Sequence, residues 1–138
     1  MEQGGYLKIK KGNKIKKEKP LQPLEFKSSD GFKILVGRNN IQNDILTLKT
    51  AMNYDMWLHV QKYAGSHTVI IGDKKEITET AIYEAACIAA YHSKAKDSSS
   101  VAVDYTLIKN VKKPTGAKPG KVIYNTYNTI YVTPEKEL

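Results

Sequence analysis

Two segments with helical periodicity divide this chain, and each follows a pair of segments with the two-residue period of β-strands. Residues 25–39 predict a hairpin in which a Ser-Ser-Asp-Gly turn joins two strands. Residues 55–61 and 66–71 predict a second pair, joined by a loop that contains Gly65. Because single strands do not alternate regularly with helices, the pattern favours an α+β fold over a doubly wound parallel sheet.

The first helical segment follows Asn39 or Asn40 as its N-cap. Its apolar side chains fall on one helical face, namely Ile41, Ile45, Leu48 and Met52. Asp44 lies in the early turns, where the helix dipole favours an acid. These positions predict an amphipathic helix.

The second helical segment is residues 72–96, and either Asp73, in a capping box with Glu76, or Thr78 begins it. A stripe of small and apolar side chains predicts close packing on a sheet: Ala81, Ala85, Ile88 and Ala89. Cys87 lies within this helix, and we expect a buried, unreactive thiol there.

Two closing strands, residues 101–111 and 121–133, complete the predicted order β-β-α-β-β-α-β-β, in one domain with a mixed or antiparallel sheet. A chain of 138 residues with 41% hydrophobic content suits one core. No apolar run approaches the ~20 residues of a membrane span, and the N-terminal residues lack the apolar region of a secretory signal. A single cysteine excludes an internal disulfide and favours a reducing compartment. We therefore expect a cytoplasmic protein.

Basic charge is concentrated at the N-terminus. The net charge is +8, of which residues 1–20 carry +5 from seven lysines and two acids. We therefore divide the chain into a lysine-rich lead-in, residues 1–24, and a folded domain, residues 25–138. Such an arm attracts polyanions, although a solvated linker, an acidic protein partner or lipid headgroups explain it equally well.

Arg38 is the one arginine among 22 basic residues. It lies between a predicted strand and a predicted helix, followed by Asn39 and Asn40. A planar guanidinium forms paired hydrogen bonds with a phosphate or a base edge, which lysine does not. The sequence therefore indicates either a ligand contact at Arg38 or an ordinary salt bridge.

The strand predicted at residues 55–61 has an unusual second face. Side chains alternate across a strand, so one face is apolar, with Met56, Leu58 and Val60. The opposite face carries Asp55, Trp57, His59 and Gln61. Aromatic faces stack on the bases of looped or single-stranded RNA. Trp57 therefore stacks on a base, braces a contact made by His59, or lies under a second layer of structure.

The segment 110–121, NVKKPTGAKPGK, predicts a basic loop. Its lysines either contact RNA or only increase solubility. Its prolines and glycines shape the backbone, and lysines surround them: Lys109, Lys112, Lys113, Lys118 and Lys121. It lacks the spacing of a phosphate-binding loop. A metal site drawn from Asp55, His59 and His67 also lacks a recognised ligand spacing.

Two longer segments carry a resemblance to a known family. Residues 28–71 and 103–134 resemble the NFACT-R domain, the C-terminal RNA-binding domain of RqcH/NEMF-type ribosome quality-control factors. Bacterial members have been labelled fibronectin-binding protein A-like. The similarity runs from about Gly5 to Pro134. It implies a C-terminal fragment that lacks the NFACT-N, helix-hairpin-helix and coiled-coil parts.

The resemblance implies a function and a set of RNA contacts. Such factors bind the large ribosomal subunit with stalled peptidyl-tRNA and recruit charged tRNA for untemplated alanine addition. The ribosome performs the chemistry, so the resemblance implies no enzyme, cofactor, small-molecule substrate or membrane, and tRNA and large-subunit ribosomal RNA as partners. The expected contacts are Arg38, Asn39, Asn40, Asp55, Trp57, His59, Ser66, His67, Lys112, Lys113 and Lys118. Ala64 departs from the family, whose bacterial members usually have proline there.

Two other functions remain open. The older family label suggests an adhesin or a protein-interaction module. Asp55, His59 and His67 would instead suit a small RNA-modifying or hydrolytic enzyme.

Overall fold

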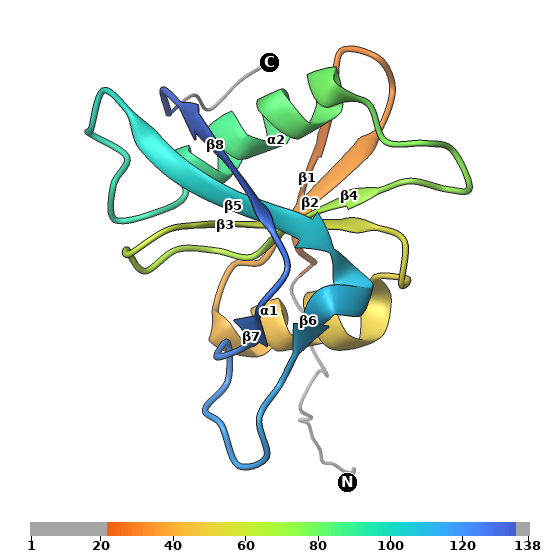
Figure 1. The fold of residues 1–138 in the computed structure, drawn as a ribbon, viewed down its shortest axis with the longest axis vertical. Coiled ribbons are helices and arrows are strands. Elements are labelled where there is room, and N and C mark those ends of the chain that lie inside the picture. The colour runs from red at the N-terminus through yellow and green to blue at the C-terminus, as the bar shows by residue number, and fades with distance from the viewer. Residues whose placement is uncertain (1–21, 135–138) are drawn as a thin grey trace, which may run out of the picture.

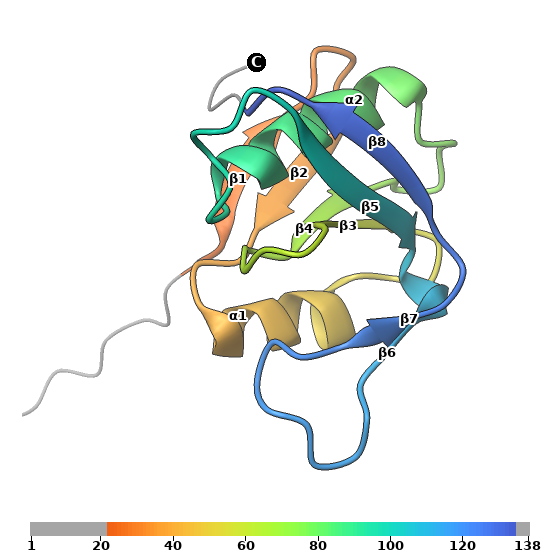
Figure 2. The same ribbon diagram turned by 60° about the vertical axis from the view of Figure 1, so that its left-hand side comes forward.

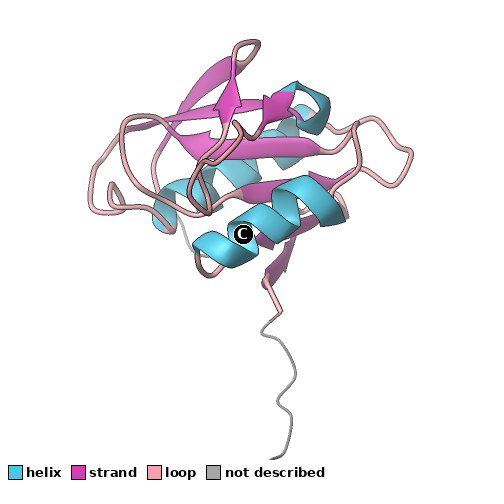
Figure 3. Cartoon of the chain, turned by 90° about the horizontal axis from the view of Figure 1, so that it is seen from below, coloured by secondary structure: helices cyan, strands magenta, loops and turns pink. Residues whose placement is uncertain are grey.

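The computed structural model describes residues 22–134, so most of the predicted lead-in lies outside the described residues. Six strands form one antiparallel sheet in the order β1-β2-β4-β3-β5-β8. Their bounds are β1 (Leu24–Lys27), β2 (Lys33–Val36), β3 (Met56–Val60), β4 (Thr68–Ile71), β5 (Val101–Leu107) and β8 (Asn128–Val132). The predicted α+β fold and the two hairpins are confirmed, and Figure 3 distinguishes the helices from the strands by colour.

The remaining elements lie on the two faces of this sheet (Figures 1 and 2). On one face lies α2 (Glu79–Tyr91). On the other lie α1 (Asn40–Ile45), which continues into the π-helical turn η1 (Leu46–Thr50), and a two-stranded sheet of β6 (Val111–Lys112) and β7 (Ile123–Tyr124). The molecule is thus a sheet between two unlike layers.

Both closing strands are shorter than expected, and each gives up residues to the small sheet. After β5 the chain turns through the 3₁₀-helix η2 (Ile108–Asn110). The amide of Ile108 donates to the carbonyl of Asp55 at 2.8 Å, and that of Lys109 donates to Asn53 at 3.0 Å. These bonds direct the chain out of the main sheet, so that Val111 enters the second layer.

Helix α2 packs on the sheet as its small-residue stripe predicts. The stripe is buried, and so is Cys87, which confirms the expected burial of the thiol. Thr78 is the N-cap, because its Oγ1 accepts a hydrogen bond from the amide of Ala81 at 3.1 Å. Alanine lets the helix approach closely, and the valine, leucine and isoleucine side chains of the strands then fill this core.

The opposite layer buries Trp57. Its side chain is 1% exposed and packs with Leu35, Leu46, Val69 and other residues under η1 and the β6–β7 sheet. Of the three roles left open for the indole, stacking on a base is therefore wrong for this structure, because no face of the ring is accessible. The covered position is confirmed. The indole also lies parallel to the ring of His59, and the bracing of an RNA contact by His59 stays a prediction.

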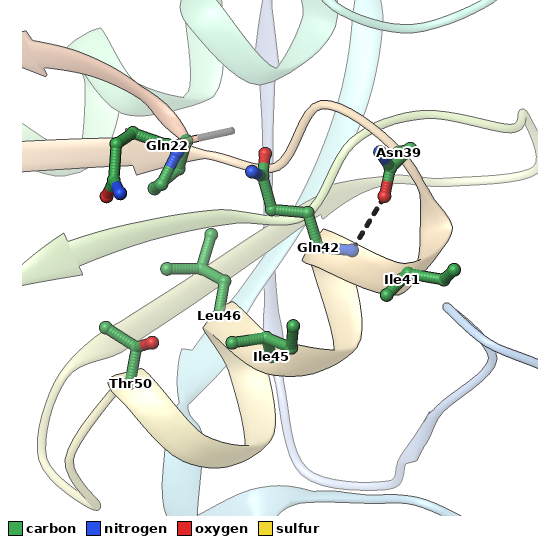
Figure 4. A pocket seen from close by; sticks show the side chains of 8 residues that line it. Gln22, Asn39, Ile41, Gln42, Ile45, Leu46 and Thr50 are labelled. Carbon is green, nitrogen blue, oxygen red and sulfur yellow. Dashed lines mark hydrogen bonds between the residues drawn. The ribbon is translucent and has the colours of Figure 1, made fainter. Parts of the chain in front are cut away.

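The apolar stripe of the first helix exists, but it faces solvent. Ile41 is 64% exposed and Met52 is 72% exposed, and Ile45 and Leu48 are also exposed. Ile41 and Ile45 line a shallow pocket with Gln22 (Figure 4). The inner face instead carries polar side chains, Gln42, Asn43 and Thr47, beside Leu46. Hydrogen bonds satisfy these groups. The burial of the apolar stripe that an amphipathic helix implies is therefore wrong.

Candidate nucleic-acid interface

A polar groove lies where the start of α1, the loop before β4 and the end of α2 meet. Its volume is about 480 Å³. We call it the Arg38 groove, and define it by residues 38–40, 64–66 and 91–94 together with Asn43 and Lys96. Four of the expected RNA contacts lie here together: Arg38, Asn39, Asn40 and Ser66.

Main-chain hydrogen bonds hold the groove together. The amide of Ser66 donates to the carbonyl of His92 at 3.1 Å, and that of Lys94 donates to the carbonyl of Ala64 at 2.9 Å. A Cβ atom at Gly65 would lie 2.9 Å from the Cβ of Ser93, so only glycine allows this crossing. Ala64 participates through its carbonyl alone, which proline also has, so the departure from the family leaves this contact intact.

Arg38 is exposed at the mouth of the groove. Its Nε donates to the carbonyl of Gln22 at 2.8 Å, and its main-chain amide donates to Oε1 of Gln42 at 2.6 Å. Within residues 22–134 it forms no ion pair with a carboxylate. Its side chain is therefore oriented by the Gln22 contact, and the salt bridge weighed for it is not formed in this part of the chain.

The two asparagines have different roles. Asn39 is the N-cap of α1, because its Oδ1 accepts from the amide of Gln42 at 2.8 Å. Asn40 is exposed and lies against Gly120, where a Cβ atom would be 2.8 Å from Asn40 Oδ1. Asn40 thus joins the groove to the lysine-rich loop that precedes β7.

Trp57, His59 and His67 meet in a second, smaller cleft. Its volume is about 300 Å³, and we call it the His59 cleft. It is lined by Trp57, His59, Val60, Lys62, Tyr63, His67, Gly120, Lys121, Val122 and Tyr124. The rings of Trp57 and His59 lie parallel, with centroids 5.8 Å apart, and His67 meets the edge of Trp57 at 5.3 Å. The buried indole therefore holds the orientation of both imidazoles.

His67 is buried and cross-links three segments. Its Nδ1 lies 2.7 Å from Oγ1 of Thr47, and its Nε2 lies 3.0 Å from the carbonyl of Gly120. Burial, reinforced by the neighbouring His59, lowers the pKa of His67 to about 4. A carbonyl only accepts, so the neutral ring donates from Nε2 and accepts the Thr47 hydroxyl proton at Nδ1. The expected RNA contact at His67 is thus replaced by a structural role.

His59 is only partly buried. Its Nδ1 lies 2.7 Å from the carbonyl of Val60, and its Nε2 lies 3.2 Å from that of Gly65. Burial lowers the pKa of His59 as well, which favours the neutral ring. With both nitrogens facing main-chain carbonyls, the part of His59 that remains for a ligand is its ring surface.

The three expected lysine contacts differ in accessibility. Lys112 and Lys118 are exposed. Lys113 instead ties its own loop: Nζ donates to the carbonyl of Lys118 at 2.6 Å and lies 3.2 Å from Oδ2 of Asp44. Oδ1 of Asp44 also accepts from the amide of Gly120 at 2.8 Å. Lys113 therefore stabilises the conformation of its own loop, in contrast to the exposed Lys112 and Lys118.

Asp55 is the clearest correction among the expected contacts. Its side chain is buried, Oδ1 accepts from the amide of Gly72 at 2.9 Å, and Oδ2 accepts from that of Met52 at 2.8 Å. It precedes β3, at the end of the strand away from His59. Both carboxylate oxygens therefore bind main-chain amides of two turns. Asp55, His59 and His67 do not come together as a catalytic or metal site. Residues 22–134 contain no group of three potential metal ligands.

The comparisons with known proteins agree on one family. Residues 22–126 match the family model described as NFACT protein RNA binding domain. The chain belongs to the NFACT-R family. This confirms the resemblance seen in the sequence, and it makes the domain an RNA-binding domain by family.

The relatives of this NFACT-R domain include longer proteins. It is 50% identical over 137 residues to "Rqc2 homolog RqcH" of Bacillus subtilis and 42% identical over 134 residues to that of Streptococcus suis. These alignments cover 98% and 96% of this chain but only 24% of each relative. A solved structure titled the C-terminal of the fibronectin/fibrinogen-binding protein from Streptococcus suis has a TM-score of 0.82 at 41% identity, over 97% of this chain and 53% of that one.

Lys94 and Lys96 of the NFACT-R domain were missed by the sequence analysis. They follow α2 and line the Arg38 groove. The basic run SKAK at the end of a helix was a visible signal, but its position beside Arg38 depends on the Gly65–Ser93 crossing, which joins distant segments. None of the helices within residues 22–134 is long and apolar enough to cross a membrane.

Proposed function

We propose that this NFACT-R domain binds structured RNA through the Arg38 groove, within a ribosome-associated quality-control factor. The observation that carries the proposal is the composition of the groove. Arg38, Lys94 and Lys96 line it, neutral hydrogen-bonding side chains lie between them, and none of the lining residues is acidic. Basic side chains on a polar, uncharged floor suit a phosphate backbone.

The basic surface extends beyond the groove. Asn40 lies against Gly120, so the loop with Lys112 and Lys118 continues from the groove wall. Net positive charge attracts RNA and makes the affinity depend on salt. Arg38, held by Gln22, is the group suited to a fixed two-point contact with phosphate.

The RNA we propose is a tRNA or large-subunit ribosomal RNA. In this account the domain positions RNA in the cytoplasm while the ribosome catalyses untemplated alanine addition to the stalled chain, and recruitment of charged tRNA involves the whole factor. No cofactor takes part. The relatives named RqcH support this proposal, and the chain spans about a quarter of their length.

The experiment compares two doubly substituted domains. Lys94→Ala with Lys96→Ala removes two groove cations, whereas Lys33→Ala with Lys75→Ala removes two exposed lysines that line another depression. Both lower the net charge equally. We expect the groove pair to weaken binding of a tRNA by about tenfold relative to the control pair, measured by fluorescence anisotropy at one salt concentration. Equal losses would contradict a localised site.

A second candidate is protein binding, because the Streptococcus suis structure is titled as a fibronectin/fibrinogen-binding protein. The same domain is therefore titrated with fibronectin after nuclease treatment at physiological salt. Binding that survives both conditions, and that ignores the groove substitutions, would favour this candidate over RNA.

A further inference from the structure

The His59 cleft has a size and a lining that suit one small planar group. Its volume of about 300 Å³ is at the lower end of the ~300–1,000 Å³ found for drug-sized ligands. We propose that it receives a single unpaired nucleobase of the bound RNA. This inference rests on the proposed RNA binding and adds a base-binding subsite to it.

Aromatic surfaces line the cleft. His59 and Tyr124 are partly exposed, and Tyr63 is 52% exposed. Both nitrogens of His59 face main-chain carbonyls, so its ring surface is what a ligand meets. Tyr124 donates its hydroxyl proton to Oδ2 of Asp104 at 2.7 Å, which fixes that ring as well. Rings held in this way are platforms on which a base of any identity stacks.

Trp57 supplies a donor that lacks an acceptor. Its indole N–H is buried and has no hydrogen-bond partner within residues 22–134. A buried polar group without a partner is rare in folded proteins. Trp57 lines the cleft, so this unsatisfied donor belongs to the same cluster of rings, beneath the exposed aromatic surfaces.

Two cations flank the cleft, and no acid lines it. Lys62 and Lys121 are both exposed lining residues. Lys62 has a φ of +66°, in the left-handed region that is uncommon for a residue other than glycine or asparagine. The tight turn places its side chain beside the cleft rather than along the strand. Phosphates on either side of an inserted base would meet these lysines.

The cleft and the Arg38 groove are neighbours. The loop of residues 62–66 separates them: the carbonyl of Gly65 contacts His59, while Ser66 lines the groove. Gly120 lines the cleft and lies against Asn40 in the groove. One RNA strand can therefore place phosphates in the groove and the next base in the cleft.

The test uses two RNAs and two tyrosine variants. The probes are an RNA hairpin with an unpaired loop and a blunt, fully paired duplex with the same number of phosphates. Tyr63→Ala removes an exposed ring from the cleft, and Tyr83→Ala removes a ring of similar exposure, 48%, from α2. We expect Tyr63→Ala to weaken hairpin binding by about tenfold, with duplex binding and the melting temperature unchanged. Tyr83→Ala changes neither affinity.

A fluorescent base locates the contact. 2-Aminopurine in the hairpin loop is expected to change its emission on binding the wild-type domain, and Lys121→Ala is expected to flatten the salt dependence by about one unit of slope. If both RNAs bind and Tyr63→Ala affects them equally or not at all, the base-binding subsite is wrong while the groove stands. If the wild-type domain binds neither RNA, the proposed function itself fails.

Discussion

On the face of the sheet beneath α2, helix and strands meet through alanine, valine, leucine and isoleucine side chains. On the opposite face, apolar side chains share the space with hydrogen-bonded polar groups. Buried Asp104 accepts from Gln61 at 2.9 Å, from Thr129 at 2.8 Å and from Tyr124 at 2.7 Å. His67 joins Thr47 to Gly120 on the same face.

The two faces of the sheet therefore have different roles: one packs the core, and the other positions loops. Apolar contacts on the α2 side are non-directional, so they stabilise the domain without fixing individual groups. Hydrogen bonds on the other side fix the loops at Gly65 and Gly120, which border both the Arg38 groove and the His59 cleft. Stability thus comes from both faces, whereas the shape of the candidate RNA surface depends on hydrogen bonds, both on the polar face and with the segment that follows α2.

Trp57→Ala and Leu58→Ala give the largest effects, from neighbouring residues on opposite faces. Each removes a fully buried side chain and should lower the free energy of unfolding by about 3–5 kcal/mol. Only Trp57→Ala should also increase hydrogen exchange at Gly120, because His67 loses its aromatic neighbour. Denaturant unfolding and amide exchange check both points. Equal exchange at Gly120 in the two variants would mean that the faces do not differ in this way.

The pH dependence of stability tests the polar face next. The pKa of His67 is lowered to about 4 in the folded protein, against about 6.5 in an unfolded chain. Between these values the unfolded chain binds protons that the folded state does not. The contribution of neutral His67 to the free energy of unfolding is therefore complete above pH 6.5. The free energy of unfolding then falls by about 3 kcal/mol as the pH drops towards 4.

His67→Gln is the matched variant, because an amide nitrogen can still donate to Gly120. It should unfold with a weaker pH dependence between pH 4 and 6.5, with His59 accounting for part of what remains. Urea unfolding at several pH values checks this. An unchanged dependence in the variant would show that His67 is not the titrating group.

Arg38→Lys tests the groove itself, which lies between the start of α1 on one face of the sheet and the end of α2 on the other. The change keeps the charge but loses the paired hydrogen bonds of the guanidinium, so RNA binding should weaken by about 1 kcal/mol with little change in melting temperature. Melting curves and RNA titrations at one salt concentration separate the two effects. A variant that unfolds easily yet binds normally per folded molecule would make Arg38 structural.

Cys87 provides the smallest expected effect, on the α2 face. Its side chain is buried in the apolar core, so a thiol reagent should react only at the rate of global unfolding. Rapid labelling of the native domain would show that α2 opens locally and that this layer is not the rigid one.

The elements of the fold could be predicted because strand and helix periods are local. The hairpin at residues 25–39 and the stripe of α2 follow from such patterns, whereas the pattern of β3 left the covering of its second face as one of three alternatives. The outward stripe at Ile41 and Met52 could not be predicted, because Thr47 on the inner face is satisfied by His67, which precedes β4 and is distant in sequence. Periodicity shows that a helix has two faces, but tertiary hydrogen bonds decide which one is buried.

The candidate site was predictable only in part. Arg38 and Ser66 stood out by residue type and neighbourhood, and the structure places both in the groove. Asp55 has the residue type of a functional carboxylate, yet two main-chain amides occupy it. Lys94 enters the groove only because Gly65 crosses Ser93. Contacts of this kind depend on three-dimensional proximity and leave no spacing in the sequence.

The most direct test of the account is a map of the bound RNA on the isotopically labelled domain by amide NMR. We predict that adding a tRNA shifts the amides of residues 38–40, 64–66 and 92–96, and leaves those of residues 73–76, at another pocket, in place. Shifts concentrated on the exposed stripe of Ile41, Ile45, Leu48 and Met52, with the groove unaffected, would contradict the account.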